Sequence, residues 1–450
     1  MPNGILLSDD PGLHAPGDRG RLPAERAVPA SGAAPRAALM RAGERTADRR
    51  VTAAGLWAAG GFLLLAIASA ALPPNDRLGT WLPLHLALAG AAAQAIGAAL
   101  PFFTASLLAG RPARWEVRAA VQVLLGTGAF AVSAGMAAHL PPVAAAGGVA
   151  FVSGIGLLAC VAFLPLRHAL GSRHSWVLAA YAAAFADVAC GASIATLEVA
   201  GFGPVATGWA WLMPAHAWLN LLGFVSLVIA GTLLHLYPTV VGSRIARGLR
   251  MRAMVSGLAL GASLVGLAYV LRADPIGRAG AATELVGTIA LVAYVGGAWR
   301  VRGRWTGDLA WRRVAIGSLG AGVAWFAFAA GVASGRVLLE GATPEAWSFE
   351  VVGAPLAAGW MAQSIVGAWT HLLPAVLGGS PRRHARQRRI LGLAGAPRIV
   401  ALNASVAILT IGLAGSSSPA TAAGAVVVAG SLILDLVLLL GATVASEPAA

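Results

Sequence analysis

The sequence has few charged residues and no lysine. Only 11% of its 450 residues are charged, and 58% are apolar. Soluble domains carry about 25% charged residues. Runs of about 20 apolar residues recur along the chain, and each is long enough to cross a bilayer as a helix. The composition excludes an ordinary soluble domain. It predicts an all-α, polytopic membrane protein whose first partner is the lipid bilayer.

Cysteine is also scarce. The chain has two cysteines, Cys160 and Cys190, and both fall inside apolar runs without forming a CxxC pair. Thiolate ligation of zinc or of an iron–sulfur cluster is therefore not indicated. We expect both residues to be small, buried apolar side chains.

The net charge of +14 comes from 32 basic residues, all of them arginine. A basic chain can bind nucleic acid, but here the arginines gather in alternate loops, which is the pattern that orients membrane helices. Nucleic acid is therefore not expected as a partner. The pattern predicts a multi-pass protein of the cell membrane with both termini in the cytoplasm. Four arginines fall in the other loops: Arg77, Arg272, Arg278 and Arg336.

The chain is predicted to have two parts. Residues 1–50 mix Pro, Gly, Ala, Asp and Arg without apolar periodicity, which is typical of a disordered cytoplasmic tail. Residues 51–446 form the transmembrane domain. We expect Trp81, Trp209 and Trp211 in the aromatic belt at the outer face. The twelve predicted helices lie near 52–72, 81–109, 119–140, 143–165, 176–199, 209–239, 251–272, 279–299, 313–335, 351–378, 398–416 and 421–445.

Two stretches resemble each other at the inner ends of helices 6 and 10. They read "GTLLHLYPTVVG" (231–242) and "GAWTHLLPAVLG" (367–378), with the same residue at six of the twelve positions. Pro238 and Pro374 occupy equivalent places, and Pro101 lies at the corresponding place of helix 2. A repeat every four helices predicts three arcs of four helices each.

Histidines within the apolar runs are the first functional candidates, because an ionisable residue in the bilayer costs about 2.5–3.5 kcal/mol on insertion scales. His85 in helix 2 and His216 in helix 6 lie near the outer face, at depths that agree within about 3 Å at 1.5 Å per residue. His139 closes helix 3 on the same side. Imidazole is the usual ligand of b-type haem iron and a common ligand of copper. His85 and His216 are therefore predicted metal ligands, with neutral, hydrogen-bonded histidines as the alternative.

Further residues are candidates for supporting roles. Asn220 follows His216 by four residues on the same helix face and could orient its ring. His235 and His371 lie near the inner ends of helices 6 and 10 and remain cofactor-binding candidates. Our preferred interpretation is that each bonds carbonyls freed by the proline one turn later. The other histidines are interpreted as solvated or lipid-facing: His14, His168, His174 and His384.

Polar residues other than histidine also occur inside the apolar runs. Asp187, in the middle of helix 5, could belong to a proton path, although hydrogen bonding between helices is the preferred interpretation. The remaining residues of this kind are Gln94, Glu284, Gln363 and Asp435.

Three segments carry a resemblance to known families: "HLALAGAAAQAIG" from His85, "HAWLNLLGFVSLVIAGTLLHLYPTVVGSRI" from His216, and "VGAWTHLLPAVLGG" around His371. The chain resembles subunit I of the haem–copper oxidases (cytochrome c oxidase subunit I) and the NnrS-type haem proteins. It is most similar to a little-characterised group of actinobacterial membrane proteins, some of which continue into a cupredoxin-type nitrite reductase or multicopper oxidase domain. The resemblance implies haem b or copper and a role in electron transfer or nitrogen-oxide metabolism. It also implies a cupredoxin-type or cytochrome redox partner.

Departures from the oxidase pattern limit that resemblance. Oxygen-reducing oxidases place two histidines two residues apart in helix 10, whereas this chain has only His371 there, near the opposite face. They also have a histidine pair in the helix 7–8 region, and residues 251–299 contain no histidine. We therefore expect no complete oxygen-reducing binuclear centre and no self-sufficient terminal oxidase. A secondary transporter and a cofactor-free membrane subunit that docks a redox partner are the alternatives.

Overall fold

The computed structural model describes residues 33–110, 112–168, 174–246 and 248–445. Within this part of the chain all regular structure is helical, and twelve helices are long and apolar enough to cross a membrane. The prediction of an all-α protein with twelve spans is confirmed. In chain order the helical segments are α1 (Ala33–Ala70), α2 (Trp81–His85), η1 (Leu86–Ala92), α3 (Ala93–Leu107), α4 (Trp115–Ala137), α5 (Pro141–Phe163), η2 (Leu164–His168), α6 (Ser175–Val199), α7 (Gly203–Thr207), α8 (Trp209–Trp218), η3 (Leu219–Val225), α9 (Ser226–Val241), α10 (Leu249–Leu271), α11 (Asp274–Arg300), η4 (Arg304–Asp308), α12 (Ala310–Glu340), η5 (Pro344–Ala346), α13 (Phe349–Ala354), η6 (Pro355–Ala362), α14 (Gln363–Leu377), α15 (Pro381–Leu391), α16 (Gly395–Ala414) and α17 (Ser418–Val444).

The chain divides into two units, Met1–Arg45 and Thr46–Ala450. Residues 1–32 of the predicted disordered tail lie outside the described residues. The α1 helix begins at Ala33, inside the segment for which the sequence predicts that tail. All twelve spans belong to the second unit.

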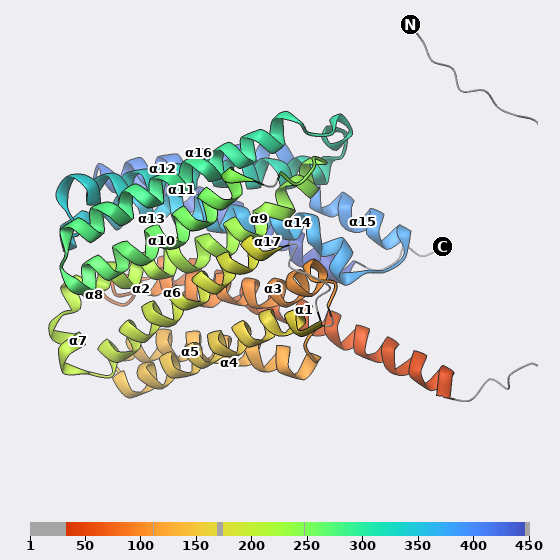
Figure 1. Ribbon diagram of the computed structural model, residues 1–450, viewed down its shortest axis with the longest axis horizontal. Helices are drawn as coiled ribbons and strands as arrows, with labels where there is room; N and C mark the ends of the chain where they lie inside the picture. Colours follow the sequence, from red (N-terminus) through yellow and green to blue (C-terminus); the bar gives the residue numbers. More distant parts are fainter. Residues whose placement is uncertain (1–32, 111, 169–173, 247, 446–450) are drawn as a thin grey trace, which may run out of the picture. The chain divides into compact units, whose positions relative to one another are not determined.

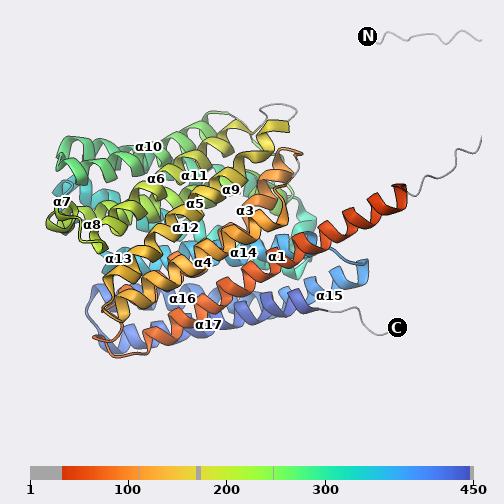
Figure 2. The same ribbon diagram turned by 90° about the horizontal axis from the view of Figure 1, so that it is seen from below.

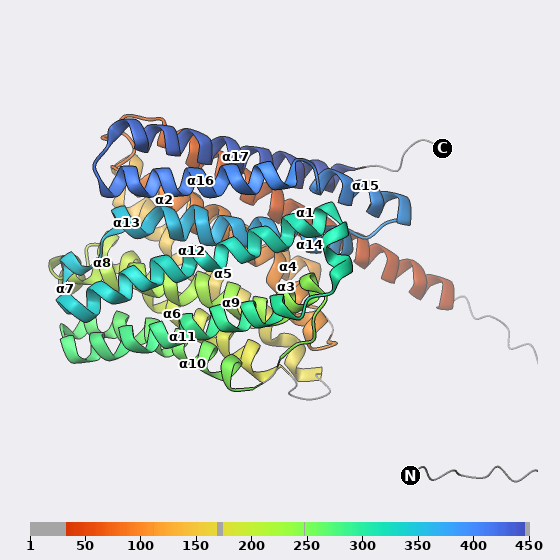
Figure 3. The same ribbon diagram turned by 90° about the horizontal axis from the view of Figure 1, so that it is seen from above.

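Helices that follow one another in the chain pack side by side in the second unit. The closest pairs are α4 with α5, α10 with α11, and α16 with α17. Figure 1 shows α2, α7 and α8 at the left end of the bundle and α15 at the right end. We call these the histidine end and the arginine end, after His85 and His216 in α2 and α8 and the five arginines of α15. The pairs α10/α11 and α16/α17 lie on opposite sides of the bundle (Figures 2 and 3).

The second, sixth and tenth spans form the centre of the bundle. Their most apolar windows are 61%, 83% and 72% buried, whereas no other span exceeds 56%. These spans touch one another, because η1 contacts η6 and α14 contacts α9. Each also contains one π-helical segment, which is η1, η3 or η6. The predicted period of four helices therefore recurs in burial and in backbone geometry, while the three-arc arrangement of the oxidases stays a prediction.

A proline in α9 leaves one buried carbonyl without its helical donor. Pro238 has no N–H to donate to the carbonyl of Leu234. The hydroxyl of Tyr294, on α11, donates a hydrogen bond to that carbonyl over 2.7 Å. The interpretation that assigned this task to His235 is therefore wrong, and Tyr294 satisfies the carbonyl instead.

Helices α10 and α11 approach each other closely through glycines. A Cβ on Gly287 would lie 2.4 Å from the backbone nitrogen of Leu258, and one on Gly257 would lie 2.5 Å from the backbone of Gly287. Only a residue without a side chain allows this approach, as at other close helix contacts in membranes. The tight contact holds Glu284, one turn before Gly287, against α10.

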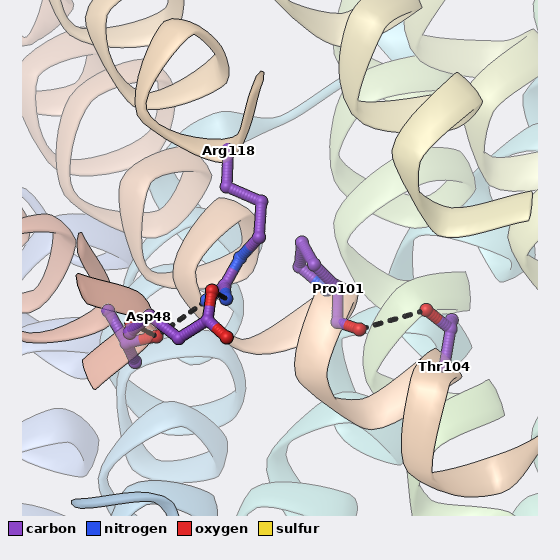
Figure 4. A network of polar contacts seen from close by, with 5 residues as sticks. Asp48, Pro101, Thr104 and Arg118 are labelled. Atoms are coloured by element: carbon purple, nitrogen blue, oxygen red, sulfur yellow. Dashed lines mark hydrogen bonds and ion pairs between the residues drawn. The ribbon is translucent and has the colours of Figure 1, made fainter. Parts of the chain in front are cut away.

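Other polar contacts join the helices at their ends. Figure 4 shows Arg118 of α4 pointing at Asp48 of α1, with Nη1 2.9 Å from the carboxylate. The Nη2 atom of Arg118 donates to the hydroxyl of Thr52 over 2.7 Å.

Cys160 and Cys190 are both exposed, so the expectation that they are buried is wrong.

Candidate functional site

Two histidines from different spans face each other at the histidine end. His85 is the last residue of α2, directly before the π-helical segment η1. His216 lies in α8, three residues before η3. The two imidazole rings are parallel to within 6°, and their centroids are 6.2 Å apart. The sequence prediction that these residues lie at similar depth agrees with this geometry.

Both rings are held by a backbone carbonyl on the same ring nitrogen. Nδ1 of His85 lies 2.9 Å from the carbonyl oxygen of Trp81, and Nδ1 of His216 lies 2.9 Å from that of Gly191. Because a carbonyl oxygen can only accept, Nδ1 carries the proton in each ring. Each Nε2 therefore keeps a lone pair. This is the tautomer in which a histidine can ligate a metal through Nε2.

Asn220 lies beside His216, as the spacing predicts. Its Nδ2 atom donates to the backbone carbonyl of His216 over 2.6 Å and lies 3.1 Å from Nδ1 of the same residue. Nδ1 cannot donate to Gly191 and accept from Asn220 at once. We assign it as the donor, because the Gly191 carbonyl has no proton to give and the Asn220 amide already has an acceptor. A Cβ on Gly191 would lie 2.5 Å from Asn220 Nδ2, so a side chain at this position would displace the amide from His216.

Two tryptophans enclose the histidine pair. Trp81 stacks on His85 with a centroid distance of 3.9 Å and an angle of 19° between the ring planes. Trp209 lies 6.2 Å from His216 at an angle of 46°. The sequence placed both tryptophans in the aromatic belt but did not indicate that they contact the histidines. Four-residue spacing between Trp81 and His85 on one helix face is the signal that could have shown the first contact.

The predicted inner histidines have separate partners. Nε2 of His235 lies 2.6 Å from Nδ1 of His174, with the rings nearly perpendicular. The interpretation of His174 as solvated or lipid-facing is therefore wrong. His371 stacks on Trp311 at 5.5 Å, and the guanidinium of Arg388 lies over the same tryptophan. These are contacts at the arginine end, far along the helices from His85 and His216.

His139 does not join the histidine pair. It is exposed and has a φ of 54°, the left-handed conformation that ends a helix. The backbone N–H of Leu140 bonds the carbonyl of Gly135 at this turn. His139 therefore terminates α4 and contributes no side chain to the site.

The candidate site contains only two metal-ligating side chains. Among the described residues there is no group of three or more His, Cys, Asp or Glu that could hold a metal ion.

No protein-family model matches the chain, and a search of the curated proteins found no match.

Proposed function

We propose that this membrane protein holds one redox-active metal between His85 and His216, as haem b iron or as copper, and takes part in electron transfer. The separation of the rings carries this proposal. The rings of His85 and His216 are parallel to within 6° with centroids 6.2 Å apart, and the carbonyl on each Nδ1 leaves each Nε2 with the lone pair that would hold the metal.

The small number of ligands favours particular metals. Structural zinc takes four protein ligands and catalytic zinc three, which two histidines do not supply. Haem iron needs only axial ligands from the protein, because the porphyrin supplies the others. Copper also favours imidazole nitrogen. Both fit the donor set, and either would supply one-electron chemistry when bound.

Residues around the pair would orient the ligands rather than react. The carbonyls of Trp81 and Gly191 fix the tautomer of each ring, and Trp81 covers one face of His85. His85 lies four residues and His216 seven residues into their spans, or about 6 and 10 Å along the helices. A metal at this depth is close to one membrane face, where a cupredoxin-type or cytochrome partner could exchange electrons with it.

An absorption spectrum with metal analysis of the purified protein tests this proposal. Protein produced with added haem and copper should show a reduced-minus-oxidised Soret difference if it binds haem, or about one copper per chain if it binds copper. His85→Ala and His216→Ala should each abolish the signal. His139→Ala, which removes an exposed histidine from the same end, should retain it. A colourless, metal-free wild-type protein would refute the proposal.

A further inference from the structure

Helices α6, α10 and α11 enclose two carboxyl groups within the membrane-spanning region. Asp187 of α6 is 4% exposed and Glu284 of α11 is 0% exposed. Asp187 lies 12 residues, or about 18 Å, from the end of its span, and Glu284 lies 10 residues, or about 15 Å, from the start of its own. Both therefore lie deeper than the histidine pair.

The two carboxyl groups meet the same stretch of α10. The hydroxyl of Ser263 donates to Oδ1 of Asp187 over 2.7 Å. Oε2 of Glu284 lies against Gly261, two residues earlier, where a Cβ would be only 2.6 Å away. Among the residues that the structure describes, three of the four carboxyl oxygens have no hydrogen-bond partner: Oδ2 of Asp187 and both oxygens of Glu284. They are buried acceptors on α6 and α11 that border the same stretch of α10.

Charge makes this arrangement unfavourable for two carboxylates. Asp187 and Glu284 are close enough for their charges to repel each other, and in the described part of the chain no basic group acts on either one. An unpaired carboxylate is costly in a bilayer, and two neighbouring ones cannot readily ionise together. The buried Asp435 differs, because Arg398 lies 3.0 Å from it.

We propose that Asp187, Ser263 and Glu284 form a proton-binding site inside the membrane, in which the two carboxyl groups hold at least one proton. A proton bound to either carboxyl supplies the donor that the bare oxygens lack. The site requires no metal and stands independently of the histidine pair.

The position of the site relates it to the rest of the bundle. Asp187 lies four residues from Gly191 on α6, or about 6 Å along the helix, and the Gly191 carbonyl binds His216. Oδ2 of Asp187 also lies against Gly223 in the π-helical segment η3. The proton site is therefore one helical turn further into the membrane than the contact that orients His216.

Infrared difference spectroscopy of the full chain in lipid bilayers tests the proposal. At neutral pH the wild-type protein should show the carbonyl stretch of a protonated carboxylic acid, and this band should shift in D2O. The double substitution Asp187→Asn with Glu284→Gln should remove it. Glu340→Gln, the same change at an exposed carboxyl at the end of α12, should leave the band unchanged.

Two outcomes would overturn the proposal. One is a protonated-acid band that persists in the double variant. The other is a pair of ionised carboxylates whose stretches respond to Na⁺, which would make the site one for a metal cation. If the double variant does not fold, Ser263→Ala serves instead: loss of the 2.7 Å hydrogen bond should shift the acid band, and an unchanged band would count against the site.

Discussion

Trp81 holds His85 by two separate contacts. Its indole stacks on the imidazole at a centroid distance of 3.9 Å, and its carbonyl lies 2.9 Å from Nδ1 of the same ring. Any residue at position 81 would supply the carbonyl, because it lies one helical turn before His85. Only a planar aromatic side chain supplies the stacking. The two contacts therefore make different predictions on substitution.

Trp81→Ala should weaken cofactor binding without abolishing it. Partners that orient a metal ligand are typically worth about 10–100-fold in metal affinity, and the alanine variant keeps the carbonyl while losing the stacked ring. Trp81→Phe should bind more tightly than Trp81→Ala, because a ring remains over His85. Titration of cofactor-free protein with haem or copper measures both affinities. Equal affinities in the alanine variant and the wild type would show that the stacking does not contribute.

Tyr294→Phe should destabilise the protein by about 1–3 kcal/mol, because it leaves the buried carbonyl of Leu234 without a donor. The cause can be isolated with Pro238→Ala, which restores an N–H at the position that normally donates to Leu234. In that background Tyr294→Phe should cost clearly less. The free energy of unfolding of the four proteins in mixed micelles gives the coupling. Equal costs in both backgrounds would mean that the hydroxyl acts elsewhere.

Gly287→Ala should separate α10 from α11. The added Cβ would meet the backbone of Leu258 at 2.4 Å, and backbone atoms cannot rotate away. Overpacking of this kind costs about 1–3 kcal/mol. Gly296→Ala is the matched control, because it lies on the same helix with nothing within 4 Å of its Cβ. It should be neutral or slightly stabilising, since alanine is the better helix former. Similar melting curves for both variants would contradict the close packing.

Several features of the molecule follow from sequence pattern alone. Apolar runs define the twelve spans, and the "HLYP" and "HLLP" repeat identifies two of the three central helices. Counting residues along helices 2 and 6 predicts that His85 and His216 lie at similar depths, because position along a straight helix is a linear function of residue number. The pairing of His235 with His174 could not be found in this way, since it depends on which face of α9 packs against the start of α6.

The remaining features depend on how each helix is rotated about its own axis and on its local backbone geometry. A π-helical segment shifts every later side chain around the helix axis, and neither its presence nor its place is marked in an apolar sequence. Asp187, Ser263 and Glu284 lie on three different helices, and composition alone shows each as an isolated polar residue. Their grouping depends on which faces of α10 pack against α6 and against α11.

Arg398→Leu should be among the most destabilising single substitutions in this chain. Arg398 of α16 and Asp435 of α17 are 5% and 7% exposed in their side chains, with Nε 3.0 Å from Oδ1. Removing one partner of a buried pair leaves an uncompensated charge and costs about 3–5 kcal/mol. Replacing both partners with leucine should recover most of the loss, because an apolar pair leaves no buried charge.

An exposed pair provides the comparison for Arg398 and Asp435. Arg336 and Glu340 lie 2.9 Å apart near the end of α12, with side chains that are 32% and 43% exposed. Water screens such a pair, so Arg336→Ala should leave the unfolding transition in mixed micelles almost unchanged. If Arg398→Leu were as mild as Arg336→Ala, the Asp435 carboxyl would have to be neutral when its partner is lost. An additional infrared band of a protonated acid, present in Arg398→Leu beside that of the wild type and lost once Asp435 is also replaced by leucine, would show this directly.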